Sequence, residues 1–70
     1  MNRRPVDSTN LLSVGYDSAD GILEVEFRNG RVYEYYRVPE AIYERLLTER
    51  SPGEFFSQHI KDQYRFRRVL

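Results

Sequence analysis

The sequence ILEVEFRNGRVYEYYR, residues 22–37, decides the fold of this chain. Apolar and acidic residues alternate up to Phe27, and a period of two is typical of a strand with one buried face. Asn29-Gly30 follows, and this dipeptide between two alternating runs is the strongest short-range signal for a β-hairpin. The stretch therefore predicts a hairpin whose second strand covers residues 32–37.

The residue pattern also selects the turn of this hairpin. A two-residue type I′ loop would pair Val25 with Glu34 and would place the apolar residues of the two strands on opposite faces. A three-residue loop, with Gly30 left-handed as a G1 bulge, pairs Val25 with Tyr33 instead and puts these residues on one face. The predicted core face consists of Leu23, Val25, Phe27, Tyr33 and Tyr35. The opposite face, expected to be mostly solvated, carries Glu24, Glu26, Val32, Glu34 and Tyr36.

A third strand is expected before the hairpin. Leu12, Val14 and Tyr16 alternate with smaller residues, which is the pattern of a half-buried strand. Residues 1–10 are polar, contain a proline and show no periodicity. We therefore expect them to form a flexible leader in front of a single domain of residues 11–70.

Two helices are predicted after the hairpin. Apolar residues recur with helical spacing over about residues 39–49, with Pro39 at the first helical position. Ser51-Pro52-Gly53-Glu54 is a complete N-terminal capping signal, and the helix that it starts is expected to end near Asp62. Residues 64–70 alternate and are expected to form an extended tail. The predicted fold class is α+β: a three-stranded antiparallel β-meander packed by two C-terminal helices, in the order βββαα.

Composition limits the function of this 70-residue chain. The chain contains no cysteine, which excludes disulfides, zinc–cysteine clusters and thiol catalysis. His59 is the only histidine, and its helical spacing places it beside apolar residues rather than beside a nucleophile. We therefore expect no enzymatic activity, no cofactor and no metal site. No segment is apolar enough for a signal peptide or a membrane span, so we expect a cytoplasmic protein.

The charge of the chain is balanced overall but unevenly distributed. Residues 17–49 hold eight acids against four arginines, a net charge of −4. Residues 50–70 hold five bases against two acids, a net charge of +3, and residues 1–16 carry the remaining +1. A basic C-terminal end on an acidic body hints at a polyanionic or acidic partner.

The basic end interleaves cations with aromatic rings, a combination that suits phosphate contact together with base stacking. The candidate nucleic-acid-binding residues are Lys61, Arg65, Arg67, Arg68, Tyr36 and Phe66. The alternative is that the aromatic side chains of the tail dock on the core while its arginines stay solvated, some of them paired with the acidic sheet. Tyr33 and Tyr35 could stack bases on a sheet, but the register makes them core rings, and we interpret them as structural.

The chain resembles the KTSC domain family from about Ser8 to Val69. The residues that carry the resemblance are Ser13-Val14-Gly15-Tyr16-Asp17, Leu23 to Phe27, Asn29-Gly30, Val32-Tyr33-Glu34-Tyr35, Val38-Pro39, Tyr43, Leu46-Leu47, Ser51, Gly53, Phe56, Ile60, Tyr64 and Arg67-Arg68. Phe55-Phe56 stands where a Tyr-Phe pair is more usual, and Arg65 stands where many members have proline; neither difference changes the expected fold. The family is named for its occurrence at the C-terminus of some lysyl-tRNA synthetases, also occurs as free-standing bacterial or phage proteins, and has no established function. The resemblance thus points to RNA only because the domain occurs within tRNA synthetases, and not through a known mechanism.

Our prediction is a small non-catalytic binding module that binds RNA through its basic C-terminal end. The alternative is a protein–protein interaction module that uses a free sheet edge, at residues 12–17 or 32–37, or a groove between the helices. In either case we expect a monomer or a weak dimer. Whether the tail packs on the domain or is free stays open at this point.

Overall fold

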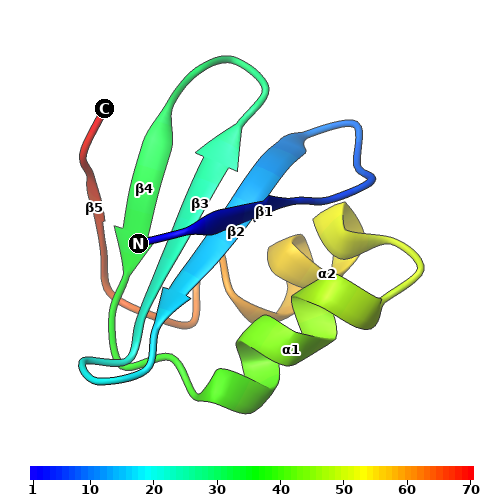
Figure 1. The fold of residues 1–70 in the computed structure, drawn as a ribbon. Coiled ribbons are helices and arrows are strands. Elements are labelled where there is room, and N and C mark those ends of the chain that lie inside the picture. Colours follow the sequence, from blue (N-terminus) through cyan, green and yellow to red (C-terminus); the bar gives the residue numbers. More distant parts are fainter.

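The hairpin lies at the centre of a five-stranded antiparallel sheet in the computed structural model, which describes residues 1–70 (Figure 1). The elements follow the chain in the order β1 (Arg3–Pro5), β2 (Leu11–Asp17), β3 (Ile22–Phe27), β4 (Val32–Tyr35), α1 (Glu40–Thr48), α2 (Pro52–His59) and β5 (Phe66–Arg68). The strands lie in the sheet in the same order, β1-β2-β3-β4-β5. The α+β class and the two helices are confirmed. The predicted sheet of three strands is wrong, because one short strand is added at each edge.

The register of the hairpin is the one that the residue pattern selects. Val25 pairs with Tyr33, and Gly30 has a φ of 91°, which glycine adopts far more readily than other residues. The backbone N–H of Phe27 donates to the carbonyl oxygen of Arg31 at 2.8 Å, and the N–H of Gly30 donates to that of Phe27 at 2.9 Å. These bonds close the predicted three-residue loop.

The N-terminal residues, expected to form a flexible leader, instead supply an edge strand. β1 pairs with β2, and Arg3 lies opposite Gly15. A Cβ atom at Gly15 would lie only 2.8 Å from the carbonyl oxygen of Asn2, so the missing side chain allows the two strands to approach this closely. The guanidinium of Arg3 also lies 3.4 Å from the carboxylate of Glu24.

The C-terminal tail supplies the strand at the opposite edge. Phe66 lies opposite Tyr35, and Arg67 lies opposite Glu34. The tail is therefore packed, and its alternating sequence is that of a strand with two different faces.

The two strands that we expected to offer free edges are internal strands. β2 pairs with β1 and β3, whereas β4 pairs with β3 and β5. The outer edges belong to β1 and β5, each three residues long. The expectation of a free edge at residues 12–17 or 32–37 is therefore wrong, and short edge strands limit pairing with another chain.

A bulge changes which leucine of β2 is buried. Leu11 is fully buried and Leu12 is 38% exposed, although the alternation placed Leu12 inside together with Val14 and Tyr16. The pairing with β3 shifts register between Leu11 and Ser13. The extra residue reverses the alternation at that point, so Leu11 points into the core and Leu12 toward solvent.

The helix ends lie close to the predicted positions. Pro39 is the N-cap of α1, with an extended ψ of 145°, rather than its first helical residue. The hydroxyl of Ser51 accepts a hydrogen bond from the backbone N–H of Glu54 at 3.4 Å, as the capping signal predicts. α2 ends before Asp62 because residues 60–63 form a turn that leads toward β5.

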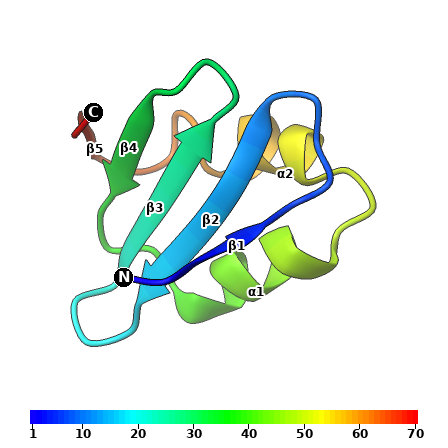
Figure 2. The ribbon, with the colours of Figure 1, turned by 45° about the horizontal axis from the view of Figure 1, so that its top comes forward.

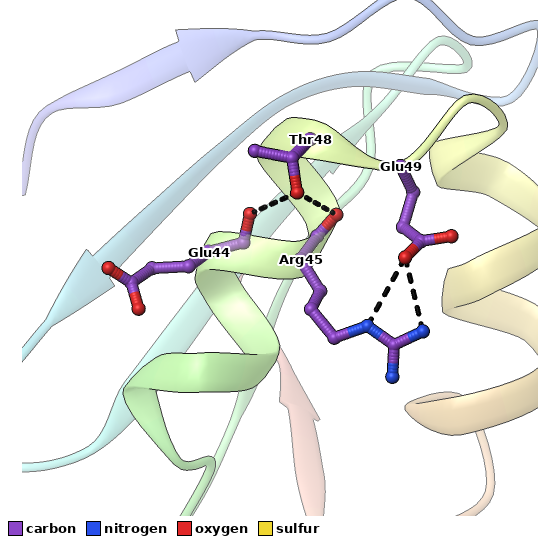
Figure 3. Close-up of polar contacts among 4 residues, drawn as sticks. All are labelled: Glu44, Arg45, Thr48 and Glu49. Carbon is purple, nitrogen blue, oxygen red and sulfur yellow. Dashed lines mark hydrogen bonds and ion pairs between the residues drawn. The ribbon is translucent and has the colours of Figure 1, made fainter.

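Polar side chains close the last turn of α1 (Figure 3). The Nη2 atom of Arg45 lies 3.1 Å from Oε2 of Glu49, and the Thr48 hydroxyl donates to the carbonyl oxygen of Glu44 at 3.2 Å. The Arg45 guanidinium carbon also stands 4.5 Å from the centre of the Phe55 ring in α2, which is a cation–π geometry. This contact links the two helices.

The core lies between the sheet and the helices. Both helices lie on one face of the sheet, toward its β1–β2 side (Figures 1 and 2). The core cluster contains Leu11, Val14, Leu23, Val25, Tyr35, Val38, Leu46, Phe55, Phe56 and Ile60. Phe27 and Tyr33 are partly buried and pack against this cluster, so the predicted core face is confirmed with these two rings at its rim. Neither helix has the length and hydropathy needed to cross a bilayer.

Candidate nucleic-acid interface

An open groove of about 470 Å³ lies between the tip of the β3–β4 hairpin, α2 and the segment that leads to β5. In Figure 2 both helices lie toward β1 and β2, and no helix lies over β4. We call this site the aromatic groove. Its aromatic residues are Phe27, Tyr33, Tyr35, Phe56 and Phe66.

Strand alternation brings these rings together. The G1-bulge register puts Phe27, Tyr33 and Tyr35 on the same face, and Phe66 joins them because β5 places it opposite Tyr35. The ring centre of Phe66 lies 5.7 Å from those of Tyr33 and Tyr35, and that of Phe56 lies 5.4 Å from Tyr35. Such distances are typical of aromatic pairs. Phe66 remains 55% exposed, so much of its ring is available to a ligand.

Charged side chains surround the rings. Arg28 and Arg31 come from the hairpin turn, whereas Lys61 and Asp62 follow α2. The Nε atom of Arg28 donates to the carbonyl oxygen of Ser8 at 2.8 Å, which fixes that side chain; none of the four takes part in the ion pairs of the domain. Three cations against one carboxylate give the groove a net charge of +2, which favours an anionic ligand.

The phenol of Tyr35 has a raised pKa. Burial raises the pKa of Tyr35 to about 12, and the neighbouring Tyr33 and Asp62 add to the shift. The contribution of Asp62 agrees with the position of both side chains in one groove, because a nearby negative charge disfavours a phenolate. A tyrosine hydroxyl is an O–H group at neutral pH even without this shift, so that of Tyr35 can donate a hydrogen bond.

Two of the predicted nucleic-acid-binding residues lie on the opposite face of the sheet. The guanidinium of Arg67 lies 3.5 Å from the carboxylate of Glu34. The Tyr36 hydroxyl donates to the same carboxylate at 3.0 Å. Partial burial and this hydrogen bond raise the pKa of Tyr36. Arg67 and Tyr36 are therefore engaged with the protein and turned away from the aromatic groove.

The rest of this face is also more covered than the sequence suggested. Arg3 of β1 lies 3.4 Å from Glu24 and 3.9 Å from Glu26, and Val32 is only 3% exposed. The expectation of a mostly solvated face is wrong, because the two edge strands bring arginines to the glutamates.

Some of the other predicted residues line the aromatic groove, and some lie outside it. Lys61 and Phe66 line the aromatic groove, and so do both tyrosines of the Tyr33-x-Tyr35 motif. Arg65 and Arg68 are exposed but lie outside the groove lining, and the Nε atom of Arg68 donates to the carbonyl oxygen of Leu70 at 3.2 Å. The Tyr-x-Tyr motif is therefore both part of the core and part of the groove wall.

Sequence reasoning missed several members of the groove. Arg28 and Arg31 flank Asn29-Gly30, and a turn bounded by two cations was a signal that could have been used. Phe56 was named among the residues that carry the family resemblance, not as a candidate for binding. Asp62 gave no signal in the sequence, because its position in the groove depends on where the turn after α2 lies.

Comparison with known proteins assigns the chain to a family. Residues 7–64 match the model of the KTSC domain. The chain belongs to the KTSC domain family. The matched region includes Tyr33, Tyr35, Lys61 and Asp62, whereas β1 and the β5 residue Phe66 lie outside it.

Relatives of this KTSC domain include small proteins of similar length and parts of larger ones. An uncharacterized protein of Stutzerimonas stutzeri is 43% identical over 70 residues, which cover 99% of each chain. The crystal structure of a KTSC domain protein from Yersinia pestis has a TM-score of 0.94 and 36% identity, covering 99% of this chain and 97% of that one. A lysine–tRNA ligase of Trichormus variabilis is 35% identical over 54 residues, which are 77% of this chain but 10% of the ligase.

Proposed function

We propose that this KTSC domain binds single-stranded nucleic acid, with RNA as its ligand, in the aromatic groove. The observation that carries the proposal is the meeting of five aromatic rings with Arg28, Arg31 and Lys61 in one open groove. Proteins that bind single strands combine stacking rings with cations that follow the phosphates. The similarity to a lysine–tRNA ligase supports RNA over DNA, because that enzyme acts on tRNA.

The residues of the groove divide into two roles in this proposal. Phe66, which is 55% exposed, and the partly buried Tyr33 offer ring faces on which a base can stack. The cations offer charge-assisted contacts to the phosphates on either side of that base. Tyr35 and Phe56 are buried and hold the other rings in place.

The tail arginines have a smaller part than the sequence suggested. Arg67 is paired with Glu34, and Arg65 and Arg68 lie outside the groove lining. A solvent-exposed cation at some distance from the groove contributes mainly a screened, long-range attraction to the phosphates of a bound strand. The C-terminal end thus contributes chiefly through Lys61 and Phe66.

The two edge strands make a sheet-edge partner a weaker candidate. β1 contains Pro5, which cannot donate a ladder hydrogen bond, and each edge strand has only three residues. No observation favours a particular protein partner over a nucleic acid.

The proposal can be tested by fluorescence anisotropy with a 5′-fluorescein heptauridylate at 50 and 200 mM salt. Three phosphate contacts predict a slope of about 2 in a plot of log Kd against log salt, at about 0.7 per contact for single strands. The double variant Arg31→Ala/Lys61→Ala should lose about 1.4 of that slope. Phe66→Ala should weaken binding about fivefold or more through lost stacking, without unfolding the domain.

Arg65→Ala/Arg68→Ala is the matched control, because it removes two exposed cations of the same segment outside the groove. It should change Kd less than threefold. No binding at 50 mM salt would overturn the proposal. An equal loss of affinity in the control and groove variants would indicate that the C-terminal tail, and not the groove, binds the strand.

A further inference from the structure

Asp62 is the one acidic side chain in the aromatic groove. It stands among three cations and yet takes part in none of the ion pairs of the domain. A carboxylate in a site for an anionic strand weakens the general attraction for phosphate. Its place in the groove therefore needs a reason other than bulk charge.

A second polar group lies in the same groove. Tyr35 also belongs to the groove lining, and Asp62 lies near enough to its hydroxyl to add to the raised pKa that burial gives it. No hydrogen bond within the domain involves either group, whereas the hydroxyls of Tyr16 and Tyr36 are both bonded. The groove thus offers a strong double acceptor and a neutral O–H donor beside its stacking rings.

The nucleobases differ in how well they match such a pair of groups. Guanine has two adjacent donors, N1–H and the N2 amino group, next to the acceptor O6. A carboxylate can accept from both donors in a bidentate contact. Adenine has an acceptor at N1, and uracil has a single N–H donor between two carbonyl acceptors, so neither offers an adjacent donor pair.

We propose that Asp62 makes the aromatic groove selective for guanine, by accepting N1–H and the N2 amino group of a base stacked on the exposed ring of Phe66. The Tyr35 hydroxyl can then donate to O6. This inference rests on the proposed binding of single-stranded RNA and adds the preferred base. Asp62 acts here as a specificity-determining residue.

The test uses the full chain and unlabelled heptamers that displace fluorescein-labelled heptauridylate. The competitors are r(UUUGUUU), r(UUUAUUU), r(UUUIUUU) with inosine at the centre, and r(UUUUUUU). A bidentate base contact predicts that the guanine heptamer binds about tenfold tighter than the adenine and uracil heptamers. Inosine lacks the N2 amino group and should bind with intermediate affinity.

The substitution Asp62→Asn separates base recognition by Asp62 from the repulsion between its charge and the phosphates. Removing the charge should strengthen the binding of r(UUUUUUU) and weaken that of r(UUUGUUU), so that the guanine preference falls below about threefold. Asp20→Asn is the matched control: Asp20 is an exposed carboxylate in the turn between β2 and β3, outside the groove lining. It should leave the guanine preference unchanged.

The outcomes distinguish this inference from the proposed function. Equal affinity of the wild-type domain for all four heptamers would overturn guanine selection and leave RNA binding intact. An equal gain in affinity for every heptamer in Asp62→Asn would show that Asp62 only repels phosphate. Failure of every heptamer to bind would overturn the proposed function itself.

Discussion

Raising the pH from 10 to 12 should destabilise this domain through the phenol of Tyr35. This side chain is 4% exposed, and burial raises its pKa to about 12. In the unfolded chain a tyrosine ionises near pH 10. Between these two values the unfolded state has lost the proton that the folded state retains, so the free energy of unfolding falls as the pH rises.

The size of the effect follows from the two pKa values. One proton of difference corresponds to about 1.4 kcal/mol per pH unit. Because each state is half ionised at its own pKa, the loss between pH 10 and pH 12 is about 2 kcal/mol. Below pH 10 both states are protonated and Tyr35 adds no pH dependence. A 70-residue domain has a stability of about 4–10 kcal/mol, so the loss should be large enough to measure easily.

The assay is urea unfolding followed by circular dichroism at pH 8, 10, 11 and 12, with Tyr35→Phe as the matched variant. Phenylalanine keeps the ring contacts with Phe56 and Phe66 and removes the ionisable group. Burial, aided by Glu40 and Asp17, also raises the pKa of Tyr16, so the variant should still lose some stability in alkali. The difference between the two proteins isolates Tyr35. An identical loss of stability in alkali for the two proteins would refute the reasoning. So would an absorbance titration of the folded protein at 295 nm in which all six tyrosines ionise near pH 10.

Three further substitutions test the fold by measured stability. Leu46→Ala removes a fully buried side chain of α1 and should cost about 2–5 kcal/mol in urea unfolding; a cost below 1 kcal/mol would contradict its place in the core. Ser51→Ala removes the cap of α2 and should cost about 1 kcal/mol, with no change in the urea m-value. Gly15→Ala would place a Cβ atom 2.8 Å from the carbonyl oxygen of Asn2. It should displace β1, raise amide exchange at Arg3 and Arg4 and leave the β3–β4 hairpin protected, whereas unchanged exchange at Arg3 and Arg4 would show that the strands separate easily.

The centre of the sheet was predictable because each of its signals is local. The position of Asn29-Gly30 and the alternation on either side allow only one register with a continuous apolar face. That register places Val25 opposite Tyr33, as the structure has it. The capping signal at Ser51 was similarly local, since a cap, a proline and a glutamate lie within four residues.

The edges of the sheet were not predictable in the same way. β1 is three residues long, too short for periodicity to be visible. The alternation of residues 64–70 was visible, but it does not tell which strand β5 pairs with. Gly15 in the middle of a strand was the one sequence hint of a close neighbour. The bulge at Leu12 likewise leaves no mark on the alternation, because two adjacent leucines fit either register.

The candidate site was predicted only in part, because some of its residues are neighbours in the sequence and others are not. Lys61 and Phe66 were named because they belong to a basic, aromatic segment of the sequence. Arg31 and Asp62 come to the same groove from elements 31 residues apart, and only the tertiary fold brings them together. The Tyr33-x-Tyr35 motif was interpreted as structural, whereas the structure shows that core rings can also form the wall of a groove.

The most direct test of the account is to locate RNA on the domain by NMR. The ¹⁵N-labelled chain of 8.4 kDa would be titrated with r(UUUGUUU) at 50 mM salt, and the amide shifts would be followed residue by residue. We predict that the largest shifts fall on the groove residues Arg31, Tyr33, Lys61, Asp62 and Phe66. Shifts confined to the opposite face, around Glu34 and Arg67, or no shifts at millimolar RNA, would contradict the aromatic groove as the binding site.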